Sequence, residues 1–103
     1  MEKDKLDQAL KTLRINGQAL AQAEHDYKIE LSKKVLELKD EGMPATLISL
    51  VIYGKPTIAK LRLERDIAES VYKANEEAIN VCKLKLRLIE NQLQREWSSV
   101  NNV

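Results

Sequence analysis

The 103-residue sequence contains no phenylalanine, and aromatic residues make up only 4% of it. It has one cysteine, one histidine, two prolines and three glycines. A core without large aromatic side chains must be built from Leu, Ile, Val and Ala, and this composition favours helices and coiled coils over sandwiches and barrels. The single cysteine excludes an internal disulfide, and the single histidine leaves little material for a histidine-based catalytic or metal site.

A strong net charge and a long apolar segment are also missing. Lys and Arg total 17 against 16 acidic residues, so no overall field draws the chain to nucleic acid or to an anionic membrane. The longest apolar run, from Leu47 to Tyr53, is interrupted by Ser49 and is far shorter than the roughly 20 residues of a membrane-spanning helix. Because the N-terminal MEKDKLDQAL is charged where a signal peptide is apolar, we expect a cytoplasmic protein.

The second half of the chain carries a heptad seam, that is, apolar residues recurring every 3.5 positions. This repeat runs for about five heptads and predicts a helix over residues 57–97 that packs against another helix. The seam consists of Ile58, Leu61, Arg65, Ala68, Tyr72, Asn75, Ile79, Cys82, Leu86, Ile89 and Leu93.

A second apolar row lies beside the seam and widens the apolar arc beyond that of a two-stranded coiled coil. The arc predicts that this helix contacts more than one neighbour. The members of the second row are Ile67, Val71, Ala74, Ala78, Val81 and Leu88.

The first half carries a weaker heptad pattern, which predicts a long helix over residues 3–41. Gly17 costs about 1 kcal/mol inside a helix relative to alanine, so it indicates a break, a kink or a close helix crossing near 16–18. The apolar positions of this pattern are Leu6, Leu10, Leu13, Leu20, Tyr27, Leu31 and Leu38.

Both prolines and two of the three glycines fall in the stretch EGMPATLISLVIYGKPT, residues 41–57. Gly42 and Pro44 end one helix and open the next, and Gly54 and Pro56 repeat this pattern. A short apolar helix over 44–53 is therefore expected to pack across the ends of the long helices. The predicted fold is a single all-α domain over 1–103, with two long antiparallel heptad helices joined by a short helical corner and a disordered tail over 98–103.

The wide apolar arc further predicts a homodimer in which two chains form a four-helix bundle or coiled coil. For Asn75 two alternatives are open, because a buried amide fixes register by pairing with its symmetry mate, whereas an amide near the bundle surface has no such role. The predicted dimer core consists of Ile58, Leu61, Tyr72, Asn75, Ile79, Cys82, Leu86, Ile89 and Leu93.

Residues suited to chemistry are few. His25 falls on a helix flank, and Cys82 falls on the seam. The inward Glu-x-x-His pattern of metal sites in helical bundles is absent. The GKP at 54–56 lacks the other residues of a phosphate-binding loop. We therefore expect no catalytic residue, no cofactor, no metal and no small-molecule substrate. The protein is predicted not to be an enzyme.

Two surfaces are candidates for binding macromolecules. The exposed edge of the corner is the predicted partner-binding surface, formed by Met43, Leu47, Ile48 and Tyr53. Two basic clusters suggest nucleic-acid binding as an alternative, although a solvated, salt-bridged helix face is the favoured interpretation. These clusters comprise Lys55, Lys60, Arg62, Lys83, Lys85 and Arg87.

From GMPATLISLVIYGKPTIAKLRLERDIAESVYKANEEAIN through KLRLIENQLQREW, the chain resembles small helical accessory proteins of phages and prophages of Gram-positive bacteria. The glycine corner, the RDIAE-x-x-Y pattern and the terminal REW carry the resemblance. It implies a phage-expressed protein, encoded near recombination genes or among genes that blunt host defence. The leading hypothesis is a non-enzymatic protein that binds a host macromolecule such as a CRISPR nuclease. DNA binding in phage recombination or transcriptional control, and a structural or scaffold role, are the alternatives.

Overall fold

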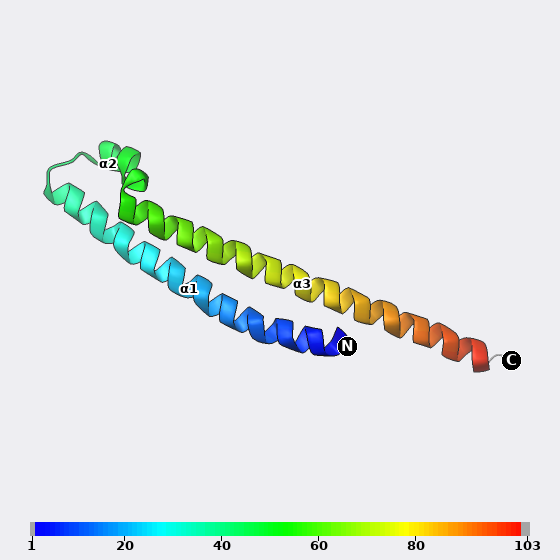
Figure 1. The fold of residues 1–103 in the computed structure, drawn as a ribbon. Coiled ribbons are helices and arrows are strands. Elements are labelled where there is room, and N and C mark those ends of the chain that lie inside the picture. The colour runs from blue at the N-terminus through cyan, green and yellow to red at the C-terminus, as the bar shows by residue number, and fades with distance from the viewer. Residues whose placement is uncertain (1, 102–103) are drawn as a thin grey trace.

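The computed structural model describes residues 2–101, and within that range it contains helices and no strands. Two long helices, α1 (Glu2–Asp40) and α3 (Pro56–Asn101), run side by side in opposite directions (Figure 1). The corner between them holds the short helix α2 (Ala45–Val51) and one 3-10 turn, η1 (Ile52–Gly54). The predicted all-α fold with two antiparallel long helices and a helical corner is confirmed.

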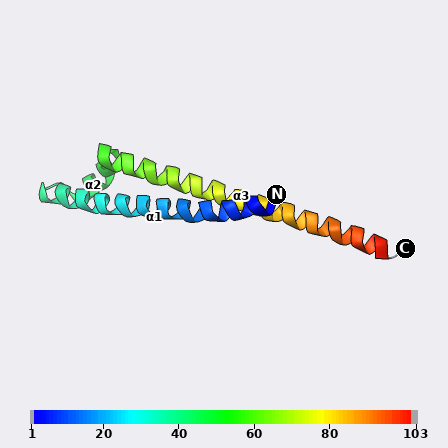
Figure 2. The same ribbon diagram turned by 60° about the horizontal axis from the view of Figure 1, so that its bottom comes forward.

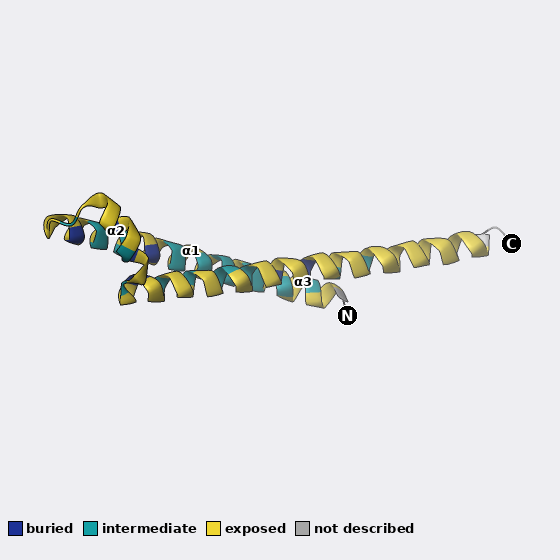
Figure 3. Cartoon of the chain, turned by 90° about the horizontal axis from the view of Figure 1, so that it is seen from above, coloured by how far each residue is buried: buried dark blue, intermediate teal, exposed yellow. Residues whose placement is uncertain are grey.

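The molecule is a rod. Its extents are 85 × 23 × 15 Å, and its radius of gyration is 23.5 Å, whereas a compact domain of this length has about 13 Å. A view from another direction shows that α3 alone continues beyond the N-terminal end of α1 (Figure 2). Much of the side-chain surface therefore stays in contact with solvent, as the burial colouring shows (Figure 3).

The structure decides between the alternatives that were open at Gly17 and moves the end of the second long helix. No break occurs near 16–18, because α1 is continuous through Gly17. A Cβ atom on Gly17 would lie 3.4 Å from Cε2 of Tyr72, so of the three alternatives the close helix crossing is the correct one. The tail was expected to be disordered from residue 98, but α3 continues as a helix through Asn101, and residues 102–103 lie outside the described range.

Gly42 ends α1 in the manner that the sequence predicts. Its φ of 88° lies in the left-handed region, its N–H donates to the carbonyl of Lys39 at 2.9 Å, and the N–H of Met43 donates to the carbonyl of Leu38 at 3.0 Å. This pair of bonds is the Schellman motif, which satisfies carbonyls that the helix end leaves without partners. Met43 then packs on the core beneath the corner, so the turn directs the chain back over α1.

Replacing Gly42 with alanine is expected to lower the free energy of unfolding by about 1–2 kcal/mol, because a Cβ atom disfavours the left-handed conformation by that amount. Gly54→Ala is the matched control, since Gly54 has no positive φ and a Cβ there meets no atom within 4 Å. Urea unfolding followed by circular dichroism measures both variants. Equal losses in the two would contradict a conformational role for Gly42.

The core lies at the corner end of the rod, where all four elements meet. α1 contributes Tyr27 and Leu38, α2 contributes Ile48, η1 contributes Ile52 and α3 contributes Ile58. The short corner helix α2 contacts α1 directly, and η1 connects it to α3, so its apolar residue Ile48 is buried in a core to which both long helices contribute. Both of these long helices belong to the same chain.

The seam of α3 faces α1 of its own chain over most of the hairpin. Ile58 and Ile79 are buried there, and Leu61, Tyr72, Cys82 and Leu86 are half-buried. Their burial in the single chain requires no second copy, and a contact between chains at these residues stays a prediction. Ile89 and Leu93, the last two predicted members of the dimer core, are exposed.

Neither alternative for Asn75 is correct. The side chain is 9% exposed, accepts a hydrogen bond from Asn16 Nδ2 at 2.7 Å and donates one to the carbonyl of Ala9 at 3.1 Å. Both bonds lie inside the hairpin, so the amide is occupied without a symmetry mate and is not at the surface. It fixes the register of α1 against α3.

Candidate interaction site

The C-terminal part of α3 extends beyond α1 and has no neighbour from another element among residues 2–101, which the structure describes. Leu86 is half-buried, and every residue from 87 to 100 is exposed. We call residues 87–101 the overhang. Part of it comes from the greater length of α3, which has 46 residues against 39 in α1, and the rest arises because α1 runs past the start of α3 at the corner end of the hairpin (Figure 1).

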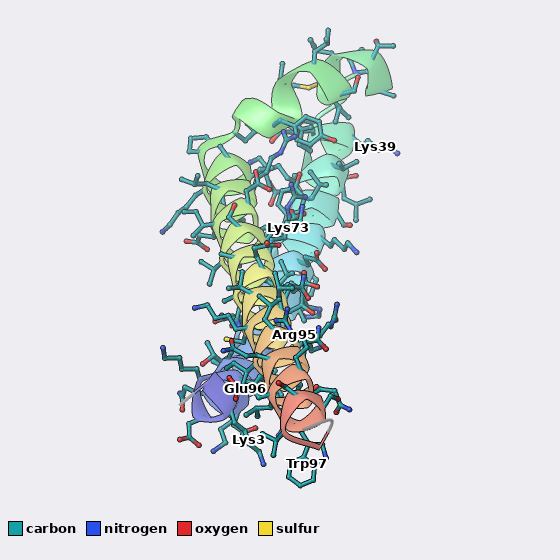
Figure 4. All side chains as sticks on the ribbon, turned by 90° about the vertical axis from the view of Figure 1, so that its right-hand side faces the viewer. Lys3, Lys39, Lys73, Arg95, Glu96 and Trp97 are labelled. Atoms are coloured by element: carbon teal, nitrogen blue, oxygen red, sulfur yellow. The ribbon has the colours of Figure 1, made fainter. Side chains whose placement is uncertain are left out.

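One face of the overhang is apolar. Ile89, Leu93, Trp97 and Val100 follow one another at spacings of four, four and three residues, which places them on one side of a helix. Trp97 is 66% exposed, and its ring projects away from both helices (Figure 4). This row continues the line of seam residues that α1 covers further back along α3. The overhang is therefore a helix whose packing face is formed but uncovered.

Polar residues keep the overhang helical and solvated on its other sides. Gln92 donates to Glu96 Oε1 at 3.3 Å across one turn, a spacing that stabilises isolated helices by a few tenths of a kcal/mol. Near the end of the helix, Arg95 lies on nearly the opposite side from Trp97, and Glu96 lies between the two (Figure 4). The segment combines one apolar stripe with a charged remainder.

The corner exposes only part of the predicted partner-binding surface. Leu47 and Tyr53 are exposed, and so is Leu50, which was not among the predicted residues. Ile48 is only 4% exposed because it points into the core, so its placement on the exposed edge is wrong. Met43 is half-buried against the same core.

A shallow groove of about 300 Å³ lies between α1 and the corner beside these residues. Tyr53 lies at the edge of this groove, and Arg62 packs on its ring, with the guanidinium carbon 4.9 Å from the ring centroid. Such a cation–π contact is worth about 0.5–1 kcal/mol at an exposed site. The groove is lined by Leu31, Val35, Lys39, Ala45, Ile48, Ser49, Ile52 and Tyr53.

Arg65 is the one charged residue of the seam that packs on an aromatic ring. Its guanidinium carbon lies 4.7 Å from the ring centroid of Tyr27 in α1, and its Nη2 donates to Asp66 Oδ1 at 2.8 Å. The hydrogen bond to Asp66 raises the pKa of Arg65 above its ordinary value. The side chain is thus an element of hairpin packing and not a free basic group.

The basic residues predicted for nucleic acid do not form one strip along the rod. Lys60 and Arg62 are exposed near the start of α3, and Lys55 is half-buried before it. Lys83 and Lys85 are also exposed, but two residues along a helix are about 200° apart around its axis, so they point to nearly opposite sides. A phosphate backbone following one face of α3 would meet only some of these side chains.

The described residues offer no constellation for metal chemistry, since no group of three or more His, Cys, Asp or Glu side chains among them could hold an ion. None of the helices they form has the length and apolar character needed to cross a membrane. No protein-family model matches the chain, and no curated protein or solved structure shows significant similarity to it.

Sequence reasoning missed Trp97 and Val100 as surface residues of interest. The long helices were predicted to have nearly equal lengths, and the residues after 97 were assigned to a tail, so no overhang was expected. The signal that could have found it is the continued spacing of Leu93, Trp97 and Val100 beyond the last heptad.

Proposed function

We propose that this chain is a non-enzymatic interaction protein whose overhang binds a partner protein. The observation that carries the proposal is the row of Ile89, Leu93, Trp97 and Val100, exposed on the part of α3 that no other described element covers. Contiguous exposed apolar rows rimmed by polar residues mark interaction sites. Amphipathic helices dock into apolar grooves through anchors at this spacing.

Trp97 is the expected anchor of the contact. Tryptophan is among the residues that dominate interface energies, because its large ring buries much apolar area at little entropic cost. The hairpin holds the overhang as a rigid extension, which reduces the ordering cost that a free peptide helix pays on binding. The partner proposed is therefore a protein with an apolar groove that accepts about three turns of helix.

The resemblance to phage accessory proteins suggests, as part of this proposal, that the partner is a protein of the bacterial host. A nuclease of a host defence system, such as a CRISPR nuclease, is the kind of partner that this setting suggests. The corner surface around Leu47 and Tyr53 and the overhang lie at opposite ends of the rod (Figure 1). A partner that binds the overhang would therefore reach the corner surface only if the partner extended along much of the rod.

The test is affinity capture from a bacterial host lysate with the full chain and with the Leu93→Ser/Trp97→Ala variant. We expect the variant to lose a partner that the unmodified chain retains, with a loss of affinity of about tenfold or more once the partner is purified. Leu36→Ser is the matched control, because Leu36 is exposed on α1 away from the overhang. Capture of the same proteins by all three chains would overturn the proposal.

Fluorescence gives a direct check of the contact, because Trp97 is the only tryptophan in the chain. Burial of its exposed ring by the captured partner is expected to shift the emission to shorter wavelength. An unchanged spectrum at saturating partner would show that binding occurs elsewhere on the rod.

A further inference from the structure

The outer side of α3 carries a second uncovered apolar row, separate from the overhang. Its large members are between 42% and 59% exposed, and the two alanines at its centre are also exposed. We call this row the α3 stripe. It consists of Leu63, Ile67, Val71, Ala74, Ala78, Val81, Leu84 and Leu88.

The order of side chains along the α3 stripe is nearly the same in both directions from its centre. Moving outward from the midpoint between Ala74 and Ala78, each direction meets an alanine and then a valine, and the next matching position holds Ile67 in one direction and Lys85 in the other. A helix face that pairs in antiparallel fashion with a second copy of itself needs such a symmetric order. If residue i of one copy contacts residue j of the other, the two-fold axis repeats the contact as residue j of the first copy with residue i of the second. The alanines at the centre allow two helices to approach closely.

We propose that two copies of the chain pair through the α3 stripe as an antiparallel dimer whose two-fold axis passes between Ala74 and Ala78. The pairing sets Ala74 against Ala78, and Val71 against Val81, of the second copy. Further out, Ile67 lies opposite Lys85 of the second copy and can pack only on the aliphatic part of that side chain, and the outermost apolar contact joins Leu63 to Leu88. This proposal is independent of partner binding by the overhang.

Charges at the ends of the α3 stripe fit the same register. Lys85 lies opposite Ile67 of the second copy, one turn from that copy's Glu64, and both side chains are exposed in the single chain. The antiparallel dimer therefore contains two symmetric Lys85–Glu64 contacts. A parallel pairing would instead place Glu64 beside Glu64 and Lys85 beside Lys85, which is repulsive.

The contact is long enough for a specific dimer. With the axis at this position, α3 of one copy overlaps α3 of the other from residue 56 to residue 96, about 60 Å at 1.5 Å per residue. A contact about 10 Å wide over this length covers roughly 600 Å² on each copy, close to the ~800 Å² of a standard interface. The hairpin keeps its own core, because the seam residues that face α1 are not used.

Sedimentation equilibrium at micromolar concentration tests the association. The unmodified chain is expected to be a dimer, and Ala78→Arg is expected to raise the dissociation constant by about tenfold or more, because two guanidinium groups would meet near the axis. Ala78 is exposed, so circular dichroism should show unchanged helicity in this variant. A monomeric unmodified chain, or a dimer insensitive to Ala78→Arg, would overturn the proposal.

A charge exchange tests the register. Glu64→Lys and Lys85→Glu are each expected to weaken the dimer severalfold, since each places like charges together across the interface. The double variant Glu64→Lys/Lys85→Glu is expected to recover the original dissociation constant. Failure of the double variant to recover it would show that the two copies do not pair in this antiparallel register.

Discussion

Replacing Ile58 with alanine is expected to lower the free energy of unfolding by about 2–5 kcal/mol. Ile58 is only 1% exposed and lies where α1, α2, η1 and α3 meet, so its removal leaves a cavity that the surrounding elements cannot easily fill. A domain of this size has a total stability of about 5–15 kcal/mol. The single change therefore removes a large share of it.

Thermal unfolding by circular dichroism measures the effect, with a loss of about 8 °C or more in Tm expected for a domain of this length. Because association also raises apparent stability, all variants must be compared at one protein concentration. Ile15→Ala is the matched control, since Ile15 is 64% exposed and alanine is the better helix former. If the two variants lost equal stability, the corner would not be the core of this protein.

Replacing Asn75 with leucine is expected to destabilise the hairpin by about 1–3 kcal/mol, although leucine is the more apolar residue. The change removes the acceptor of Asn16 Nδ2 and leaves the amide of Asn16 half-buried without its partner. A buried polar group that loses its partner retains its full desolvation cost. The size of the loss reports how well the hairpin excludes water at this point.

The double variant Asn16→Leu/Asn75→Leu separates this explanation from simple misfit. Replacing both partners of a buried hydrogen bond by apolar groups is often neutral or stabilising, so the double variant is expected to be at least as stable as the unmodified chain. Urea unfolding of the two single variants and the double variant gives the coupling energy. Additive losses would mean that the two amides act independently.

The sequence predicts the helices and the corner well because those features depend on local chemistry. The 3.5-residue repeat of the second half marks α3, and the pairing of Gly42 with Pro44 marks the end of α1 and the start of α2. Gly42 has the positive φ expected of a helix-ending glycine. These elements would be recognised in any chain that carried the same residues.

The candidate sites are predicted less well, because exposure depends on which elements lie side by side. Ile48 and Leu47 are neighbours of similar character, yet one is buried in the core and the other faces solvent. The seam residues Ile79 and Leu93 also look alike in the heptad, but α1 covers only the first. No local pattern separates the members of such pairs.

The sequence by itself determined that the chain forms two long amphipathic helices around an apolar corner, because helix periodicity and the Gly and Pro positions are local properties. Only the tertiary structure decided where α1 stops covering α3, which leaves Trp97 open to solvent, and which side of α3 faces α1, which leaves the α3 stripe open. The register of the hairpin, fixed by the corner and by the Asn16–Asn75 bond, is a contact between residues 59 positions apart. Such a contact exists only once the helices have packed.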